Sequence, residues 1–145
     1  MFNALSFQRV AHALHRAGFG RAALLVTAAA RTLFAAHVPP EVVIGLGTEF
    51  GYGGIGVIIH RDAIIGRNVL ISPGVVIGGR SEMRGVPVIE DGAKIGAGAK
   101  VLGPIRIGAG AKVGANAVVI HDVAPGQTVA GVPARPLHNR KRSAA

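Results

Sequence analysis

The sequence contains no cysteine, and this absence removes several kinds of chemistry at once. Without cysteine the chain has no disulfide, no thiolate nucleophile and no thiolate ligand for a metal. Disulfides belong mainly to secreted proteins, so we expect a cytoplasmic location.

Large aromatic side chains are scarce as well, because tryptophan is absent and there are only one tyrosine and five phenylalanines. Yet half of the 145 residues are apolar, so the core has to be built from Val, Ile, Leu and Ala. The chain is long enough for one domain and too short for two comfortable ones. Its 22 glycines would be unusual in an ordinary helical or sandwich domain.

Acidic residues are few, seven against sixteen Lys and Arg, which leaves a net charge of +9. Such an excess can indicate a nucleic-acid-binding protein. Here the cations are dispersed apart from Arg140, Lys141 and Arg142 in a basic C-terminal tail (138–145), and no aromatic-rich surface accompanies them. We therefore expect no nucleic-acid partner, and the basic surface suits a cofactor that carries phosphates.

No hydrophobic run is long enough to cross a membrane. The strongest candidate, AALLVTAAA over 22–30, ends at Arg31 and falls short of the ~20 apolar residues of a span. The charge pattern before it also differs from that of a signal peptide. We expect two short helices, separated by Gly18 and Gly20, in an N-terminal segment over 1–36, and no membrane partner.

From Ile59 onward the sequence repeats with a period of six. A helix repeats near 3.6 residues and a meander strand at two, so neither explains this period. Hexapeptide periodicity is typical of a parallel β-helix, in which each hexad forms one short strand and one corner of a triangular coil. The aliphatic residues that carry the period are Ile59, Ile65, Ile71, Ile77, Ile89, Ile95, Val101, Ile107, Val113 and Val119.

A second, smaller residue follows most of these aliphatics four positions later. The aliphatic fills a narrow interior, the smaller residue fits where the chain turns, and stacked coils bury one another's apolar edges. The smaller set comprises Ala63, Val69, Val75, Ala93, Ala99, Ile105, Ala111, Ala117 and Val123. The sequence therefore predicts a mainly β domain over 37–137.

Two segments depart from this regularity. Ile44 and Phe50 keep the six-residue step, but the next aliphatic in phase is nine residues later, so GYGGIGV (51–57) contains an insertion. In GGRSEMRGVPV (78–88) the smaller residues lapse, and the residues present suit a loop. Breaks in a regular scaffold are where functional residues tend to lie.

Three segments give the chain a resemblance to a known family: IGRNVLISPGVVIGG (65–79), IGAGAKVLGPIRIGAGAKVGANAVV (95–119) and AGVPAR (130–135). Together they resemble the serine acetyltransferase branch of the hexapeptide acyltransferases. The resemblance implies a left-handed parallel β-helix, assembly as a homotrimer or a pair of trimers, and acetyl-CoA in a groove between subunits. It implies no metal.

The resemblance also indicates which residues would hold the cofactor. Small residues let the pantetheine arm lie close to the coil, and cations meet the phosphates. By family position, the residues expected to contact the cofactor are Gly78, Gly79, Ala97, Gly98, Ala115 and Arg135, with Lys100 or Lys112 also near the phosphates. The alternative is that these small residues are ordinary corner residues of the coil.

The catalytic residues are less clear, because two histidines of the family are replaced here by Tyr52 or Gly53 and by Val86. Acetyl transfer to a hydroxyl needs a general base and a donor for the oxyanion. His60 follows the insertion at an outward corner, and imidazole is the side chain most often used as a general base near neutral pH. We therefore predict His60 as the base, and Asp62 could orient its ring. Tyr52 is the second candidate, better suited to donating a hydrogen bond.

Several functions remain open from the sequence. The leading one is an acetyl-CoA-dependent O-acetyltransferase acting on serine, and a sugar hydroxyl in surface polysaccharide synthesis is an alternative acceptor. A catalytically silent trimer that binds coenzyme A is another alternative. A carbonic anhydrase built from hexapeptide repeats is disfavoured, because it would need three histidines on one zinc ion. Only His60 and His121 lie within the coils, with His37 at their border.

Overall fold

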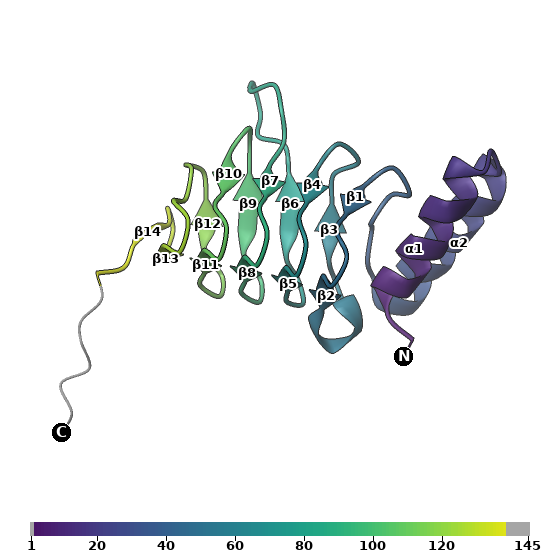
Figure 1. Ribbon diagram of the computed structural model, residues 1–145, viewed down its shortest axis with the longest axis horizontal. Coiled ribbons are helices and arrows are strands. Elements are labelled where there is room, and N and C mark those ends of the chain that lie inside the picture. Colours follow the sequence, from purple (N-terminus) through teal and green to yellow (C-terminus); the bar gives the residue numbers. More distant parts are fainter. Residues whose placement is uncertain (1, 139–145) are drawn as a thin grey trace.

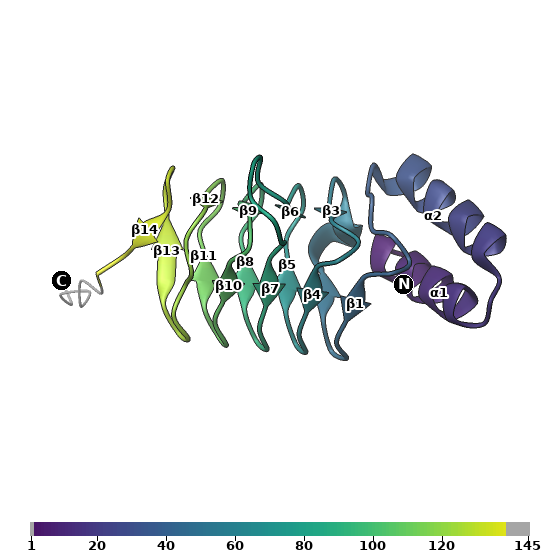
Figure 2. The ribbon, with the colours of Figure 1, turned by 90° about the horizontal axis from the view of Figure 1, so that it is seen from above.

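The computed structural model describes residues 2–138 as two helices followed by a left-handed parallel β-helix, which confirms the predicted fold class (Figure 1). Helix α1 covers Ala4–Arg16 and α2 covers Gly20–Phe34. Four complete coils and a partial fifth follow, and the helices and the last strand lie at opposite ends of the stack (Figures 1 and 2). Of the predicted C-terminal tail, only His138 lies within the described residues.

Three sheets form the sides of the triangular coil. Sheet I contains β1 (Val43–Ile44), β4 (Ile64–Ile65), β7 (Val88–Ile89) and β10 (Arg106–Ile107). Sheet II contains β2 (Glu49–Phe50), β5 (Leu70–Ile71), β8 (Lys94–Ile95), β11 (Lys112–Val113), β13 (Thr128–Ala130) and the antiparallel β14 (Arg135–Pro136). Sheet III contains β3 (Ile58–Ile59), β6 (Val76–Gly78), β9 (Lys100–Leu102) and β12 (Val118–Val119).

The ten periodic aliphatics all point into the coil, with at most 4% of any of them exposed. The smaller residues four positions later are buried as well, with exposures of at most 8%. Both sets belong to one continuous core that reaches from α1 to the last coil. The predicted arrangement of the six-residue repeat is therefore confirmed.

The strand register locates both irregular segments. A complete coil takes 18 residues, as between Val88 and its partner Arg106. Ile64 instead pairs with Val43, 21 positions earlier, and with Val88, 24 positions later. The three extra residues lie in the 3-10 turn η1 (Gly51–Gly54) and the residues after it, and the six extra residues form the predicted loop between β6 and β7, which projects from the body (Figure 1).

Helix α1 covers the open N-terminal end of the β-helix. Ala4 and Leu5 join the core, and the buried Gln8 side chain donates a hydrogen bond to the Val42 carbonyl at 3.0 Å. His12 makes a 2.7 Å contact from Nδ1 to the Pro40 carbonyl, so this imidazole has a structural role. Without α1, the carbonyl groups of Val42 and Pro40 at this end of the stack would lose these partners.

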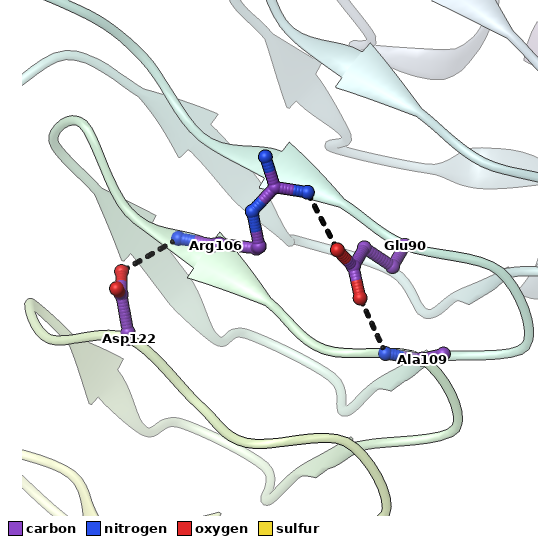
Figure 3. Close-up of polar contacts among 4 residues, drawn as sticks. All are labelled: Glu90, Arg106, Ala109 and Asp122. Carbon is purple, nitrogen blue, oxygen red and sulfur yellow. Dashed lines mark hydrogen bonds and ion pairs between the residues drawn. The ribbon is translucent and has the colours of Figure 1, made fainter.

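Carboxylates connect successive coils on the outside. Glu90 accepts hydrogen bonds from the Arg106 guanidinium and from the Ala109 amide, and Asp122 accepts from the Arg106 amide at 2.9 Å (Figure 3). The Arg106 hydrogen bond, followed by the Ala109 amide, lowers the pKa of Glu90 below its ordinary value of 4.5. Ionised Glu90 is thus favoured in the folded state.

A lowered folded-state pKa stabilises the protein above the unfolded pKa, and this contribution is lost as the pH falls through the folded value. We expect Glu90→Gln to lower the Tm at pH 7 by no more than about 5 °C, because the pair is solvent-exposed. Once the pH has fallen below the lowered pKa of Glu90, the two proteins should have nearly the same Tm. Thermal unfolding followed by circular dichroism across this range would measure it, and a difference that grows toward acid would contradict it.

Candidate active site

The site residues predicted from the sequence lie on two different corners of the triangle. The corner between sheets II and III carries Tyr52, Ala97, Gly98 and Ala115, each from the turn between a sheet II strand and a sheet III strand. The corner between sheets III and I carries His60, Gly78 and Gly79. Arg135 is exposed on β14 after the last coil, and its side chain donates to the neighbouring Ala134 carbonyl at 3.2 Å.

The first corner is a continuous row of backbone hydrogen bonds. The Gly74 amide donates to Ile55, the Gly98 amide to Pro73 and the Asn116 amide to Ala97, at 2.8–2.9 Å. This row connects the insertion in the first coil with Ala97 and Ala115, both exposed. Small residues along the row leave the backbone accessible.

Lys100 places a cation over the same row. Its Nζ donates to the Gly98 carbonyl at 2.8 Å and to the Gly74 carbonyl at 3.1 Å. On the outer face of sheet III its ladder partners are the apolar Val76 and Val118. Lys112 is exposed on sheet II. Of the two lysines, only Lys100 lies beside the small residues predicted to hold the cofactor.

Tyr52 lies in the insertion with an unusual backbone. Its φ of 49° and ψ of 40° are left-handed, and Gly53 and Gly54 continue with φ values of 76° and 78°. Left-handed backbone is uncommon for a large side chain and often marks a functional constraint. The Tyr52 residue is 88% exposed. The turn thus presents the phenol outside the coil.

His60 lines a hollow of about 230 Å³ at the other corner, together with His37, Ile58, Val76 and Gly78. The His60 side chain is 42% exposed. The Asp62 amide donates to Nδ1 at 3.2 Å, while a carboxylate oxygen of Asp62 lies 3.8 Å from the same nitrogen. The amide hydrogen bond requires an unprotonated Nδ1, which places the proton of a neutral ring on Nε2, whereas a protonated Nδ1 would face the carboxylate instead. In both forms Asp62 fixes the orientation of the ring.

His37, which the sequence places at the border of the coils, lines the same hollow as His60. A parallel β-bridge joins His37 to Ile58, and its carbonyl accepts from the Ile59 amide at 2.9 Å. The six-residue period could have indicated that His37 belongs to the first coil. Val38 lies six residues before Ile44, in phase with the inward aliphatics, and is 5% exposed. His121 lies in the last turn, far along the stack from this hollow.

Gly78 and Gly79 differ from other glycines of the repeat. A Cβ on Gly96 would lie 2.6 Å from the Ala115 nitrogen, and one on Gly66 would lie 2.8 Å from the Asp91 nitrogen, because the next coil is stacked there. A Cβ on Gly78 or Gly79 would meet nothing within 4 Å, and neither has a positive φ. A glycine without an internal reason often marks the close approach of a ligand or another chain.

The described residues contain no group of three or more His, Asp or Glu side chains that could hold a metal. No helix within 2–138 is long and apolar enough to span a bilayer. The geometry described above leaves two candidate sites for chemistry, the hollow lined by His60 and the backbone row that runs from Tyr52 to Ala115.

Comparisons with known proteins agree with this architecture. Residues 87–121 match the family model "Bacterial transferase hexapeptide (six repeats)". A serine acetyltransferase of Bacillus subtilis is 39% identical over 135 residues, which are 92% of this chain and 62% of the relative. A soybean serine acetyltransferase complexed with serine superposes with a TM-score of 0.85 at 43% identity, and a serine acetyltransferase complex with CoA with a TM-score of 0.85 at 35%.

The two superpositions cover 92% of this chain and 56% and 55% of the solved chains, so this chain spans a little over half of their length. The stacked three-sided coils and the matching repeat model define a hexapeptide-repeat protein. Within that class, the relatives and structural neighbours that this chain resembles are serine acetyltransferases, and they support the serine acetyltransferase-like branch.

The contrast between Gly96 and Gly78 can be tested directly, because each glycine follows an inward isoleucine. We expect Gly96→Ala to destabilise the fold by roughly 1–3 kcal/mol, since its methyl group meets backbone atoms. Gly78→Ala should change the free energy of unfolding by less than about 0.5 kcal/mol. Denaturant unfolding of both variants is the measurement, and equal destabilisation would show that Gly78 has a structural role after all.

Proposed function

We propose that this chain is an acetyl-CoA-dependent O-acetyltransferase that acts on L-serine and works as a homotrimer. The main support is similarity at 35–43% identity over 92% of the chain to serine acetyltransferases, including forms complexed with CoA and with serine. The similar region includes both corners described above.

The residues present fit coenzyme A. Exposed Ala97 and Ala115 and the backbone row beside them can lie against an extended pantetheine arm, and the free space at Gly78 admits a ligand. Lys100 and Arg135 supply positive charge for phosphates. Acetyl-CoA brings an activated thioester, and the protein has to place a hydroxyl against it.

The reaction needs one proton to move. The acceptor oxygen attacks the thioester carbon, the C–S bond breaks, and the hydroxyl proton ends on the thiol of coenzyme A. We assign the first transfer to the His60 imidazole, with Asp62 as the residue that orients the ring. We assign to Tyr52 a hydrogen bond to the reacting oxygens. His37 is next to His60 and is the reserve candidate for the base.

A trimer explains how these groups can act together. His60 and Tyr52 lie on different corners of one coil, so one chain alone separates them. In a trimer, one corner of a subunit can face the other corner of its neighbour. The outer faces of the sheets carry exposed apolar side chains suited to such contacts, among them Val43, Ile58 and Ile64 at 44–55% exposure.

The assignment of the base can be tested by substitution. The wild-type protein should release free thiol from acetyl-CoA when L-serine is present. His60→Ala should lower this turnover by roughly 10² or more while keeping coenzyme A binding. Tyr52→Phe should lose about fivefold, the value of one hydrogen bond. His121→Ala, at the same type of corner in the last coil, is the matched control and should keep full activity.

Full activity of His60→Ala would place the base elsewhere. A wild-type chain that binds coenzyme A but turns over neither serine nor any of a panel of sugar acceptors would favour the catalytically silent trimer.

The proposed position of coenzyme A can be tested by filling the row of small residues. Ala115→Trp should abolish coenzyme A binding, measured by calorimetry, because indole would fill the row beside Ala97. Ala109→Trp is the control, since it occupies the equivalent position at the corner between sheets I and II of the same coil. Both variants should keep the mass of three 14.7 kDa chains in light scattering. A monomeric wild type, or unchanged binding in Ala115→Trp, would contradict the proposal.

A further inference from the structure

The outer face of α2 is exposed and has no partner among residues 2–138. Ala23, Thr27 and Ala30 form the buried side of this helix, with exposures of 0–8%. The opposite side follows the helical spacing of three and four residues. Its members, all exposed, are Arg21, Leu24, Leu25, Ala28, Arg31 and Thr32.

Leucines form the centre of this face and arginines its ends. Leu24 is 63% exposed and Leu25 is 73% exposed. The Thr32 hydroxyl donates to the Ala28 carbonyl at 3.1 Å, so its polar group is satisfied by the helix itself. Arg21 and Arg31 take part in neither of the two ion pairs of the described chain.

Charge decides what kind of surface this face would meet. Residues 1–40 contain four arginines and no acidic residue, and the first carboxylate of the sequence is Glu41. Two copies of the hairpin placed face to face would therefore bring only cations together. An anionic surface is the complementary partner. Since the face belongs to a single helix, it offers leucines for insertion but no groove of its own for a protein segment.

We propose that the outer face of α2 docks peripherally on a lipid bilayer with anionic headgroups. Leu24 and Leu25 enter the boundary between headgroups and acyl chains, and Arg21 and Arg31 contact the headgroups. The hairpin lies at the end of the β-helix opposite β14, so docking leaves the corners of the coils free (Figures 1 and 2). This revises the expectation of no membrane partner, which rested on the absence of a span, and it is independent of the acetyltransferase proposal.

The test is sedimentation of the full chain with vesicles of phosphatidylcholine, with and without phosphatidylglycerol. We expect binding only to the anionic vesicles, weakened by added salt. Arg21→Gln/Arg31→Gln should lower the vesicle partition coefficient by roughly tenfold or more, at about 1 kcal/mol for each cation. Leu24→Ser/Leu25→Ser should lower it by about tenfold through lost apolar burial.

Matched controls separate this face from general basic charge. Arg67→Gln/Lys94→Gln removes two exposed cations from the β-helix, and Arg140→Gln/Lys141→Gln/Arg142→Gln neutralises the tail. Both should change the partition by less than about twofold. An equal loss in either control, unchanged binding of the leucine variant, or equal binding to both vesicle types would overturn the proposal.

Light scattering without lipid gives a further control. An unchanged mass of Leu24→Ser/Leu25→Ser supports lipid docking. A fall in mass would identify this face as a contact between copies and would also overturn the proposal.

Discussion

The stacking of one coil on the next is the constraint on which the rest of this structure depends. Paired strands place each inward residue directly against its equivalents in the coils above and below, as Ile65 lies between Ile44 and Ile89. An interior built this way accepts aliphatics of similar size at every level. It also brings backbone against backbone at the corners, which is why Gly96 and Gly66 have no room for a side chain.

Much of this could be predicted because the constraint acts on every hexad. Residues such as Ile71 and Ala99 repeat the same requirement, so the period survives variation at single positions, and both are buried as expected. The insertion near Tyr52 and the loop after Gly78 were found for the same reason, since an interruption is visible only against a regular pattern. The antiparallel β14 was not predicted, because it lies beyond the last hexad and follows no repeat.

The candidate site was less predictable, because it depends on outward-facing residues that the repeat does not constrain. His60 and Tyr52 are close in sequence, yet β3 separates them onto two corners. Conversely, His37 and His60 are distant in sequence, and the parallel bridge to Ile58 brings them into one hollow. The sequence spacing indicated which side chains point outward. It did not indicate the corner of the triangle on which each one lies, because that depends on how the three-residue insertion shifts the chain.

That insertion also connects the fold with the chemistry proposed for it. A strict 18-residue coil would leave no freedom to aim a side chain, since each corner position is fixed by its neighbours along the stack. Three extra residues in left-handed and glycine-rich backbone release Tyr52 from that alignment, while Gly56 rejoins the row next to Gly74. The first coil can carry such an irregularity because α1 packs against its insertion and covers the open end of the core. The N-terminal hairpin is thus part of what holds the proposed site in place, while the outer face of α2 stays exposed among the described residues.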